Sequence, residues 1–465
     1  MIPFFGLMPQ DAYYHFYGKN LALSYYDHPG MIGYALRLFT SVFGKHVWVI
    51  KLTDFVVTSF TLMACYYLAT LFLPKKKAQN AFLLIGSTIL ISILSLVSTP
   101  DVPLLLFWTL SIIFLYKAIF ENKNQFWLYA GISIGLALHS KYTAIFILCG
   151  LIGFLLFSTK YRKLFASPGV WVCLIISFVV FTPVLWWNYQ NDFVSLNFQV
   201  SDRIIKFSEF KISFKKFGAV ILHQSFILLP ILFFAIVSMT LKYLKKIIYK
   251  LKLPSQKTLF LLSFFIPVFL VFFLISPFIW VKLNWMMPAY ITGIILVTIY
   301  LSPKMRKLQL GFALFFHLVL SIQVIFYLVP IKSDDTWYGW DDLVNEVKIK
   351  QKTHPHTFVF SFDNYKTSAI LDFYLDENVY AHNIVGYPAL QFDYANQNLS
   401  LLTQKNALFI DSDTSFKNRK KKGDIPPELN LYFEEVTELE PLIIKKGDRE
   451  VRKFWVYYCK KYKGR

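Results

Sequence analysis

The polar segment Gln10-Asp11-Ala12-Tyr13-Tyr14 is followed a few residues later by Tyr25-Tyr26-Asp27-His28-Pro29-Gly30-Met31. The two stretches contain two acids, a histidine and four tyrosines, and they stand directly ahead of a long series of apolar runs. Apolar runs that are long enough to cross a bilayer predict a membrane protein. The two polar stretches are then predicted to lie at the membrane surface where the protein acts.

The composition supports a membrane protein. Of 465 residues, 56% are hydrophobic and only 16% are charged, which is too apolar for an ordinary soluble protein. The net charge of +20 does not indicate nucleic-acid binding, because the Lys and Arg clusters sit in short gaps between apolar runs.

Apolar runs that approach the roughly 20 residues needed to span a bilayer core recur along the first two thirds of the chain. They lie at 47–73, 79–98, 102–120, 126–140, 142–158, 169–187, 218–241, 258–278, 286–301 and 309–329. Two of them, 126–140 and 142–158, are interpreted as short helices that meet at Ser140-Lys141, because a lysine is unfavourable at the bilayer centre. We therefore expect about ten spans.

The orientation follows from clusters of Lys and Arg in four short loops, at 75–77, 160–163, 242–257 and 304–307. These loops alternate correctly with the others, so the positive-inside rule places them in the cytoplasm. The opposite loops carry the acidic and polar segments and are expected on the outer, periplasmic side, together with both ends of the chain.

Residues 30–45 have apolar side chains at the spacing of an amphipathic helix, with Arg37 among them. We favour a helix lying along the outer membrane interface. The alternative is that these residues form the first turns of the next span.

The composition changes after about residue 330. Strands are predicted at 357–362, 407–410, 442–444 and 454–458, and a helix at 365–375. The sequence therefore predicts a polytopic α-helical membrane domain over 1–330, with a periplasmic first loop at 1–46. A C-terminal periplasmic α/β domain is expected over 331–465. The run 417–422 reads as a solvated loop or a lipid-headgroup contact.

Polar side chains at the outer ends of the spans are the candidates for chemistry, because polar groups at membrane depth must line a cavity. They are Asp11, Asp27, His28, Asp101, Lys141, Asn188, Gln190, Gln199, Arg203, Lys282 and Asn284. Acids and cations together suit an anionic lipid substrate, and they suit an ion pathway equally well. No P-loop, GxGxxG, HExxH or CxxC pattern appears, so no nucleotide cofactor is expected.

In this order, the polar motifs resemble those of the GT-C class of membrane glycosyltransferases, in particular the bacterial group akin to aminoarabinose transferases and dolichyl-phosphate-mannose protein mannosyltransferases. The resemblance covers nearly the whole chain. It is carried by Asp11-Ala12-Tyr13-Tyr14, Tyr26-Asp27-His28-Pro29, Thr99-Pro100-Asp101-Val102-Pro103, Gly135 to Tyr142, Trp187-Asn188-Tyr189-Gln190, Asn197-Phe198-Gln199 with Arg203, Asn284-Trp285, Gly339-Trp340 and Phe454-Trp455-Val456-Tyr457.

The resemblance implies a hexosyl or pentosyl transferase of the bacterial inner membrane. Such an enzyme moves a sugar, with inversion, from a polyprenyl-phosphate donor of the undecaprenyl-phosphate type to an acceptor at the periplasmic face. The acceptor is expected to be lipid A, another envelope glycan or a protein.

The resemblance also implies roles for single residues. Asp11 is expected to orient or deprotonate the acceptor, and Asp27 with His28 to hold a divalent metal ion or the donor phosphate. The residues expected to bind the donor phosphate or substrate are His28, Asp101, Lys141, Asn188, Gln199 and Arg203. Fixed cations would stabilise a departing phosphate well in a dry site.

Structural explanations stay open beside these roles. Asp11 and Asp101 are also suited to cap the helices that follow them, and His28 to an interfacial proline turn. For Tyr13, Tyr14, Tyr25 and Tyr26 we favour an aromatic belt at the membrane interface over contacts to a sugar.

Two features depart from the resemblance. The family often has two adjacent acids where this chain has Gln10-Asp11, and it usually has a transmembrane helix ahead of that motif. The alternatives to an active transferase are a transporter or flippase of lipid-linked sugars, and a binding-only relative without activity.

Overall fold

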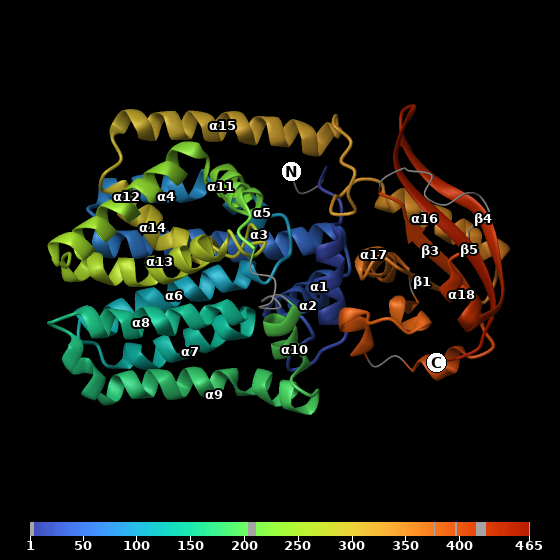
Figure 1. Ribbon diagram of the computed structural model, residues 1–465, viewed down its shortest axis with the longest axis horizontal. Coiled ribbons are helices and arrows are strands. Elements are labelled where there is room, and N and C mark those ends of the chain that lie inside the picture. Colours follow the sequence, from blue (N-terminus) through green and yellow to red (C-terminus); the bar gives the residue numbers. More distant parts are fainter. Residues whose placement is uncertain (1–3, 203–210, 376, 396–397, 415–424, 465) are drawn as a thin grey trace.

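The computed structural model describes residues 4–202, 211–375, 377–395, 398–414 and 425–464. A helical body is followed by a domain built on a five-stranded sheet. The described helices of the body are α1 (Pro9–Lys19), α2 (Met31–Phe43), α3 (Val47–Phe72), α4 (Lys75–Gly86), α5 (Ile89–Leu94), α6 (Asp101–Phe120), α7 (Gln125–Ser140), α8 (Ile145–Phe157), α9 (Pro168–Gln190), α10 (Val194–Asn197), α11 (Phe214–Leu228), α12 (Pro230–Lys250), α13 (Gln256–Ile275), α14 (Met287–Thr298) and α15 (Pro303–Phe326). Figure 1 shows the long helices lying side by side, with the sheet domain at one end of the body next to α1.

Each predicted apolar run contains a helix or a pair of helices. Among the described residues, α3, α6, α9, α13 and α15 are each long and apolar enough to cross a membrane. The chain is a multi-pass membrane protein, and the number of about ten spans stays a prediction.

Two of the predicted runs are not single continuous helices. The run 79–98 divides into α4 and α5, and the run 218–241 divides into α11 and α12, which are bent by 116° relative to one another. Pro230 begins α12 and has no backbone N–H to continue the hydrogen bonding of α11, which explains the second break.

Helices α1 and α2 cross in close contact at two glycines. A Cβ atom on Gly18 would lie 2.7 Å from the carbonyl oxygen of Gly33, and one on Gly33 would lie 2.7 Å from the Cβ of Tyr17. Larger side chains would push the helices apart. The close crossing holds the connecting loop, which carries Asp27 and His28, against α1.

Helix α2 is a helix of its own rather than the start of α3. It ends before Gly44, whose φ of +84° breaks the helical path. Ile32, Gly33 and Leu36 are buried on its inner side, whereas Leu38 and Val42 are 62% and 66% exposed. This is the amphipathic pattern that the sequence predicts for residues 30–45.

The C-terminal domain contains a mixed sheet in the order β2-β1-β3-β5-β4. Its elements are α16 (Trp340–Thr353), β1 (Thr357–Ser361), α17 (Lys366–Tyr374), β2 (Val379–Tyr380), β3 (Asn406–Ser412), α18 (Pro427–Tyr432), β4 (Phe433–Lys446) and β5 (Arg449–Tyr462). The first three strands pair in parallel, and β3/β5 and β4/β5 are antiparallel.

The predicted strands of this domain are confirmed, although β4 and β5 extend well beyond the predicted segments into one long hairpin. The two-residue strand β2 has too little sequence pattern to be predicted. Residues 417–422 lie outside the described part of the chain. Their predicted role as a solvated loop or a lipid-headgroup contact therefore stays a prediction.

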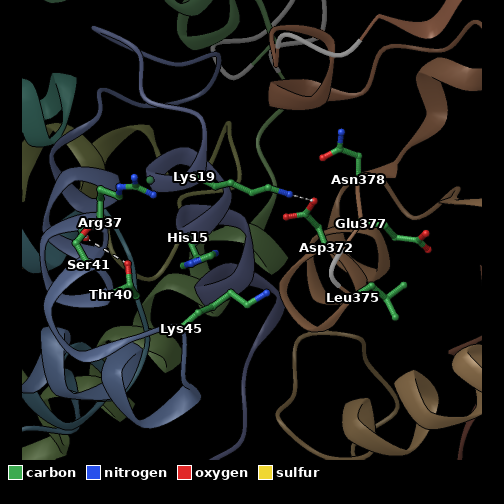
Figure 2. Close-up of a pocket in the computed structure, with 11 residues that line it drawn as sticks. His15, Lys19, Arg37, Thr40, Ser41, Lys45, Asp372, Leu375, Glu377 and Asn378 are labelled. Carbon is green, nitrogen blue, oxygen red and sulfur yellow. Dashed lines mark hydrogen bonds and ion pairs between the residues drawn. The ribbon is translucent and has the colours of Figure 1, made fainter. Parts of the chain in front are cut away.

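The sheet domain contacts the membrane domain mainly through α17 and α1. The rings of Tyr13 and Tyr365 are 4.3 Å apart between centroids, and Lys19 Nζ donates to Asp372 Oδ1 at 2.7 Å. The His15 ring meets the ring of Phe373 edge-on at 4.9 Å. Aromatic packing and the ion pair of Lys19 with Asp372 thus hold α1 of the membrane domain against α17 of the sheet domain (Figure 2).

We expect His15 to make folding sensitive to acid. Burial and the neighbouring cations Lys45, Lys19 and Arg37 lower its pKa to about 4, against 6.5 for a free imidazole. Between these values the unfolded chain binds a proton that the folded chain does not, so stability falls as the pH falls through that window. The loss should reach about 3 kcal/mol near pH 4.

Thermal unfolding of the purified protein between pH 7 and pH 4 measures this effect. We expect the variant His15→Phe to lose less stability on acidification than the unmodified protein. His46→Phe, at an exposed position, should follow the unmodified protein. Identical acid sensitivity of His15→Phe and the unmodified protein would contradict the assignment.

Candidate active site

Asp11 lies in the first turn of α1, and its carboxylate is fully buried. Its Oδ2 accepts hydrogen bonds from the backbone N–H of Met8 at 2.8 Å and from Lys51 Nζ. Its Oδ1 accepts from the backbone N–H of Ser98 at 2.8 Å. The helix-capping interpretation is therefore correct in part, since Asp11 reaches back to Met8. The carboxylate also joins α1, α3 and the segment before α6.

Lys51 is a site residue that the sequence interpretation missed. It is fully buried on α3, and besides Asp11 its ammonium donates to the carbonyl oxygen of Leu96 at 2.7 Å. It also lies 4.6 Å from the centre of the Phe5 ring. In the sequence, Lys51 falls within the apolar run 47–73. A lone lysine in such a run is itself a signal, because an ionisable group at membrane depth needs a partner.

Asp54 was missed for the same reason. It lies one helical turn after Lys51 and is fully buried. Its Oδ2 accepts from the hydroxyl of Ser98 at 2.7 Å, and its Oδ1 has no hydrogen-bond partner among the described residues. Ser98 thus holds Asp11 with its backbone and Asp54 with its side chain.

A second buried group is built on Asp101, at the start of α6. Lys141 Nζ donates to both carboxylate oxygens of Asp101 at 2.9 Å, and Asn284 Nδ2 donates to Oδ2 at 2.6 Å. The three residues come from sequence positions up to 183 apart. The structure therefore brings these predicted residues together, and it gives Lys141 a carboxylate partner in the protein. Asp101 stands three residues after Ser98, so the two groups are linked by the chain.

A third group surrounds Asp27. Its Oδ1 accepts from the hydroxyl of Tyr13 at 3.2 Å and from the hydroxyl of Tyr17, and its backbone carbonyl accepts from Gln199 Nε2. Burial and the Asp27 carboxylate raise the pKa of Tyr17, so this hydroxyl stays protonated and donates. Asp27 and Gln199 are thus brought together, as the sequence motifs suggest.

The prediction of an aromatic belt at the membrane interface is wrong for three of the four tyrosines. Tyr13, Tyr14 and Tyr25 are buried, whereas belt residues face the membrane interface. Tyr25 donates to the carbonyl oxygen of Tyr17 at 2.8 Å. The Tyr13 ring packs against Tyr365 at the start of α17, so the sheet domain covers it, and the Tyr14 and Tyr25 rings pack against Tyr17.

The metal interpretation of Asp27 and His28 finds little support in the geometry. His28 is buried beside Asp27, but in the described part of the chain no three His, Cys, Asp or Glu side chains gather closely enough to share an ion. Two tyrosine hydroxyls already occupy Asp27 Oδ1. These residues do not by themselves fit a protein-held metal, and the metal stays a prediction.

The remaining candidates do not join these groups in the same way. Asn188 is fully buried, donates to the carbonyl oxygen of Val184 at 2.9 Å and accepts from the N–H of Leu196 at 3.2 Å. Its Nδ2 also donates to the hydroxyl of Tyr142, the residue after Lys141, at 3.3 Å. It therefore shapes the end of α9. Gln190 and Lys282 are exposed. Arg203 lies outside the described residues.

Met8, just before α1, and Gln10, the residue before Asp11, line a cavity of about 790 Å³. Gln10 and Thr99 line it near the buried acids, and side chains of α3, α5, α11 and α15 supply an otherwise mostly apolar lining, including Phe55, Phe226 and Leu320. A mostly apolar cavity with a few polar residues in its wall suits a lipid with a polar head.

Comparisons with known proteins agree with this architecture. A family model described as Dolichyl-phosphate-mannose-protein mannosyltransferase matches residues 27–187. The crystal structure of ArnT from Cupriavidus metallidurans matches with a TM-score of 0.57 in the apo state and in the state bound to undecaprenyl phosphate. The identities are 12% and 13%, and each match covers 93% of this chain and 88% of ArnT.

The chain has the ArnT fold. The predicted fold class, a helical GT-C-like membrane protein with a C-terminal α/β domain, is confirmed. Lipid A galacturonosyltransferase RgtD of Rhizobium johnstonii is 26% identical over 309 residues, which are 64% of this chain and 62% of RgtD. The matched region is thus less than two thirds of RgtD. Together these matches confirm the resemblance to GT-C membrane glycosyltransferases.

Proposed function

We propose that the chain is a glycosyltransferase of the bacterial inner membrane. It moves a hexose or pentose unit from a polyprenyl-phosphate donor of the undecaprenyl-phosphate type to an envelope acceptor at the periplasmic face. The observation that carries the proposal is the buried Asp11 carboxylate, whose neighbours Met8 and Gln10 line an apolar cavity of about 790 Å³. Lipid A, another glycan or a protein is the acceptor.

The relatives support the choice of donor and acceptor. One of the matched ArnT structures holds undecaprenyl phosphate, and RgtD is named for transfer to lipid A. The cavity beside Asp11 is lined by apolar side chains from several helices and fits a prenyl chain. A lipid lying in it would bring its phosphate and sugar to the level of Gln10 and Thr99.

In the reaction, an acceptor oxygen forms a bond to the anomeric carbon while the bond from that carbon to the donor phosphate breaks. Asp11 orients the acceptor and takes its proton, and the lipid phosphate leaves on the opposite side with inversion. Lys51 and the backbone N–H groups of Met8 and Ser98 hold Asp11 in place. A positioned carboxylate is a well-suited base for this step.

Lys141 contributes a buried positive charge near the second acid. Two of the three N–H donors of its ammonium engage Asp101, which leaves one for a phosphate oxygen. Asp101 and Asn284 fix its position, so little reorganisation would be needed as charge develops on the departing phosphate.

Mass spectrometry of lipid A and envelope glycans from a deletion strain tests the proposal. We expect the loss of one sugar mass from a single envelope component, restored by the unmodified gene and not by the gene that encodes Asp11→Asn. Purified protein with the lipid-linked sugar should also produce the modified acceptor. Movement of that lipid across vesicle membranes without transfer would instead support a transporter or flippase.

A further inference from the structure

The segment between α5 and α6 lies against one face of α3. Three side chains on that face, Lys51, Asp54 and Thr58, follow one another at helical spacing, so they point to the same side of the helix. Lys51 donates to the carbonyl oxygen of Leu96 at 2.7 Å, and the Thr58 hydroxyl donates to that of Leu94 at 3.0 Å. Irregular backbone at membrane depth needs such partners within the protein, and α3 supplies them.

Ser98 connects this segment to the proposed base. Its hydroxyl donates to Asp54 Oδ2 at 2.7 Å, and its backbone N–H donates to Asp11 Oδ1 at 2.8 Å. Asp101, which pairs with Lys141, stands three residues further along the chain. A shift of Ser98 would therefore loosen the hold on Asp11 and alter the distance of Asp11 from that ion pair.

The polar contacts of Ser98 depend on these two acids. Ser98 is fully buried and lies outside any helix or strand, so no regular series of backbone hydrogen bonds fixes its orientation. Within the part of the chain that the structure describes, its hydroxyl donates to Asp54 and its N–H to Asp11. Without the acceptor on Asp54, the buried hydroxyl would be left unpaired or would turn to another group.

Charge balance does not explain why residue 54 is an acid. The group contains two fully buried carboxylates, those of Asp11 and Asp54, and one ammonium. Lys51 pairs with Asp11, and among the described residues it makes no hydrogen bond or ion pair with Asp54. Asp54 Oδ1 also has no hydrogen-bond partner there. A buried acid without a cation of its own is unfavourable, so its presence at this place indicates a role in function.

We propose that Asp54 is a positioning residue for sugar transfer. Through the Ser98 hydroxyl it holds the Ser98 N–H on Asp11, and it does not touch the substrate. This inference rests on the proposed function, in which Asp11 takes the proton of the acceptor. The placement of a base affects the chemical step more than the binding of the donor, so the role predicts a change in kcat with little change in the donor KM.

Transfer kinetics of the purified full-length protein test the proposal, with the undecaprenyl-phosphate sugar and the acceptor that the deletion strain identifies. We expect Asp54→Leu, which removes the acceptor oxygens, to lower kcat at least about tenfold and to leave the donor KM within about twofold. Asp54→Asn keeps an oxygen that accepts from Ser98, so it should retain at least about a third of kcat. Both variants leave the pair of Lys51 with Asp11 in place and should fold.

A double-mutant cycle shows whether Asp54 acts through Ser98. Ser98→Ala removes the hydroxyl and keeps the backbone N–H, and it leaves α3 unchanged. It should lower kcat to about the same extent as Asp54→Leu. The double variant Asp54→Leu/Ser98→Ala should then be no slower than either single variant, whereas two independent roles would multiply the losses.

Thr61→Val is the matched control on α3. Thr61 is buried, and its hydroxyl donates to the carbonyl oxygen of Val57 in the same helix at 3.0 Å, so kcat should stay within about twofold. Equal kcat in the unmodified protein and Asp54→Leu, multiplied losses in the double variant, or an equal loss in Thr61→Val would overturn the proposal and leave the proposed function standing. No transfer by the unmodified protein would refute the proposed function, and this inference with it.

Discussion

Replacing Asp11 by asparagine is expected to lower the rate of sugar transfer by at least about 100-fold, because the amide cannot accept the acceptor's proton. Binding of the donor lipid should change by less than about threefold, since the apolar cavity that would hold it is unaltered. Transfer is measured with purified protein and a lipid-linked sugar, and binding with the same lipid in the absence of acceptor.

The ion pair of Asp11 with Lys51 means that Asp11→Asn also lowers stability. A second substitution at Lys51 provides the control for this effect. Asparagine leaves the ammonium of Lys51 without its carboxylate partner in a fully buried position, which is destabilising by about 3–5 kcal/mol. The double variant Asp11→Asn/Lys51→Met removes both charges, so it should unfold at a higher temperature than Asp11→Asn while transfer stays lost. Full transfer activity in either folded variant would refute the role of Asp11.

The transfer and binding assays also test the departure from the family pattern at position 10, where Gln10 stands in place of an acid. Gln10 donates to Asp335 Oδ1 at 2.9 Å, and Lys366 pairs with the other oxygen of Asp335 at 2.9 Å. In Gln10→Glu, the new acid would face Asp335, which weakens the contact between α1 and the sheet domain. We expect this variant to transfer no faster than the unmodified protein. Activity that appears only in Gln10→Glu would show that the natural chain is a binding-only relative.

Breaking the pair of Asp101 and Lys141 should produce the second large effect. Asp101→Asn leaves the Lys141 ammonium, which is 3% exposed, without a carboxylate partner, and we expect a loss of about 3–5 kcal/mol. Asp101→Asn/Lys141→Met should recover most of that loss, because removing both charges removes the unpaired one. Thermal unfolding of the three proteins measures both changes.

Donor kinetics separate a structural role for Lys141 from a role in binding phosphate. If Lys141 also contacts the donor phosphate, the stable double variant should show a raised KM for the lipid-linked sugar or a lowered kcat. Lys117→Met, on the same helix as Asp101 but near its other end, is a matched control for the loss of one lysine. An unfolding temperature of Asp101→Asn equal to that of the unmodified protein would contradict the ion pair.

Much of the architecture could be predicted from local sequence. The apolar runs predict helices, the change after residue 330 predicts a separate α/β domain, and the alternating pattern of 357–362 predicts the first strand. These properties depend on neighbouring residues, because hydrophobic length and periodicity act within one segment. The break between α11 and α12 can also be traced to a local cause, Pro230.

The partners of the site residues depend on the packing of distant helices. The backbone of Ser98, 87 positions away, binds Asp11, and Asn284, 183 positions away, binds Asp101. The burial of Tyr13 depends on the sheet domain covering α1. These pairings cannot be predicted from the composition. Before the packing of the helices is known, many polar residues elsewhere in the chain could be the partner of a polar residue at the end of a span.

Local sequence was enough to predict a multi-pass helical protein with a C-terminal α/β domain and a polar segment at Gln10 to Met31. The pairing of Asp11 with Lys51 and of Lys141 with Asp101 depends on how distant helices pack. Membrane insertion is specified segment by segment through hydrophobicity, whereas a buried charge is stable only beside one particular opposite charge.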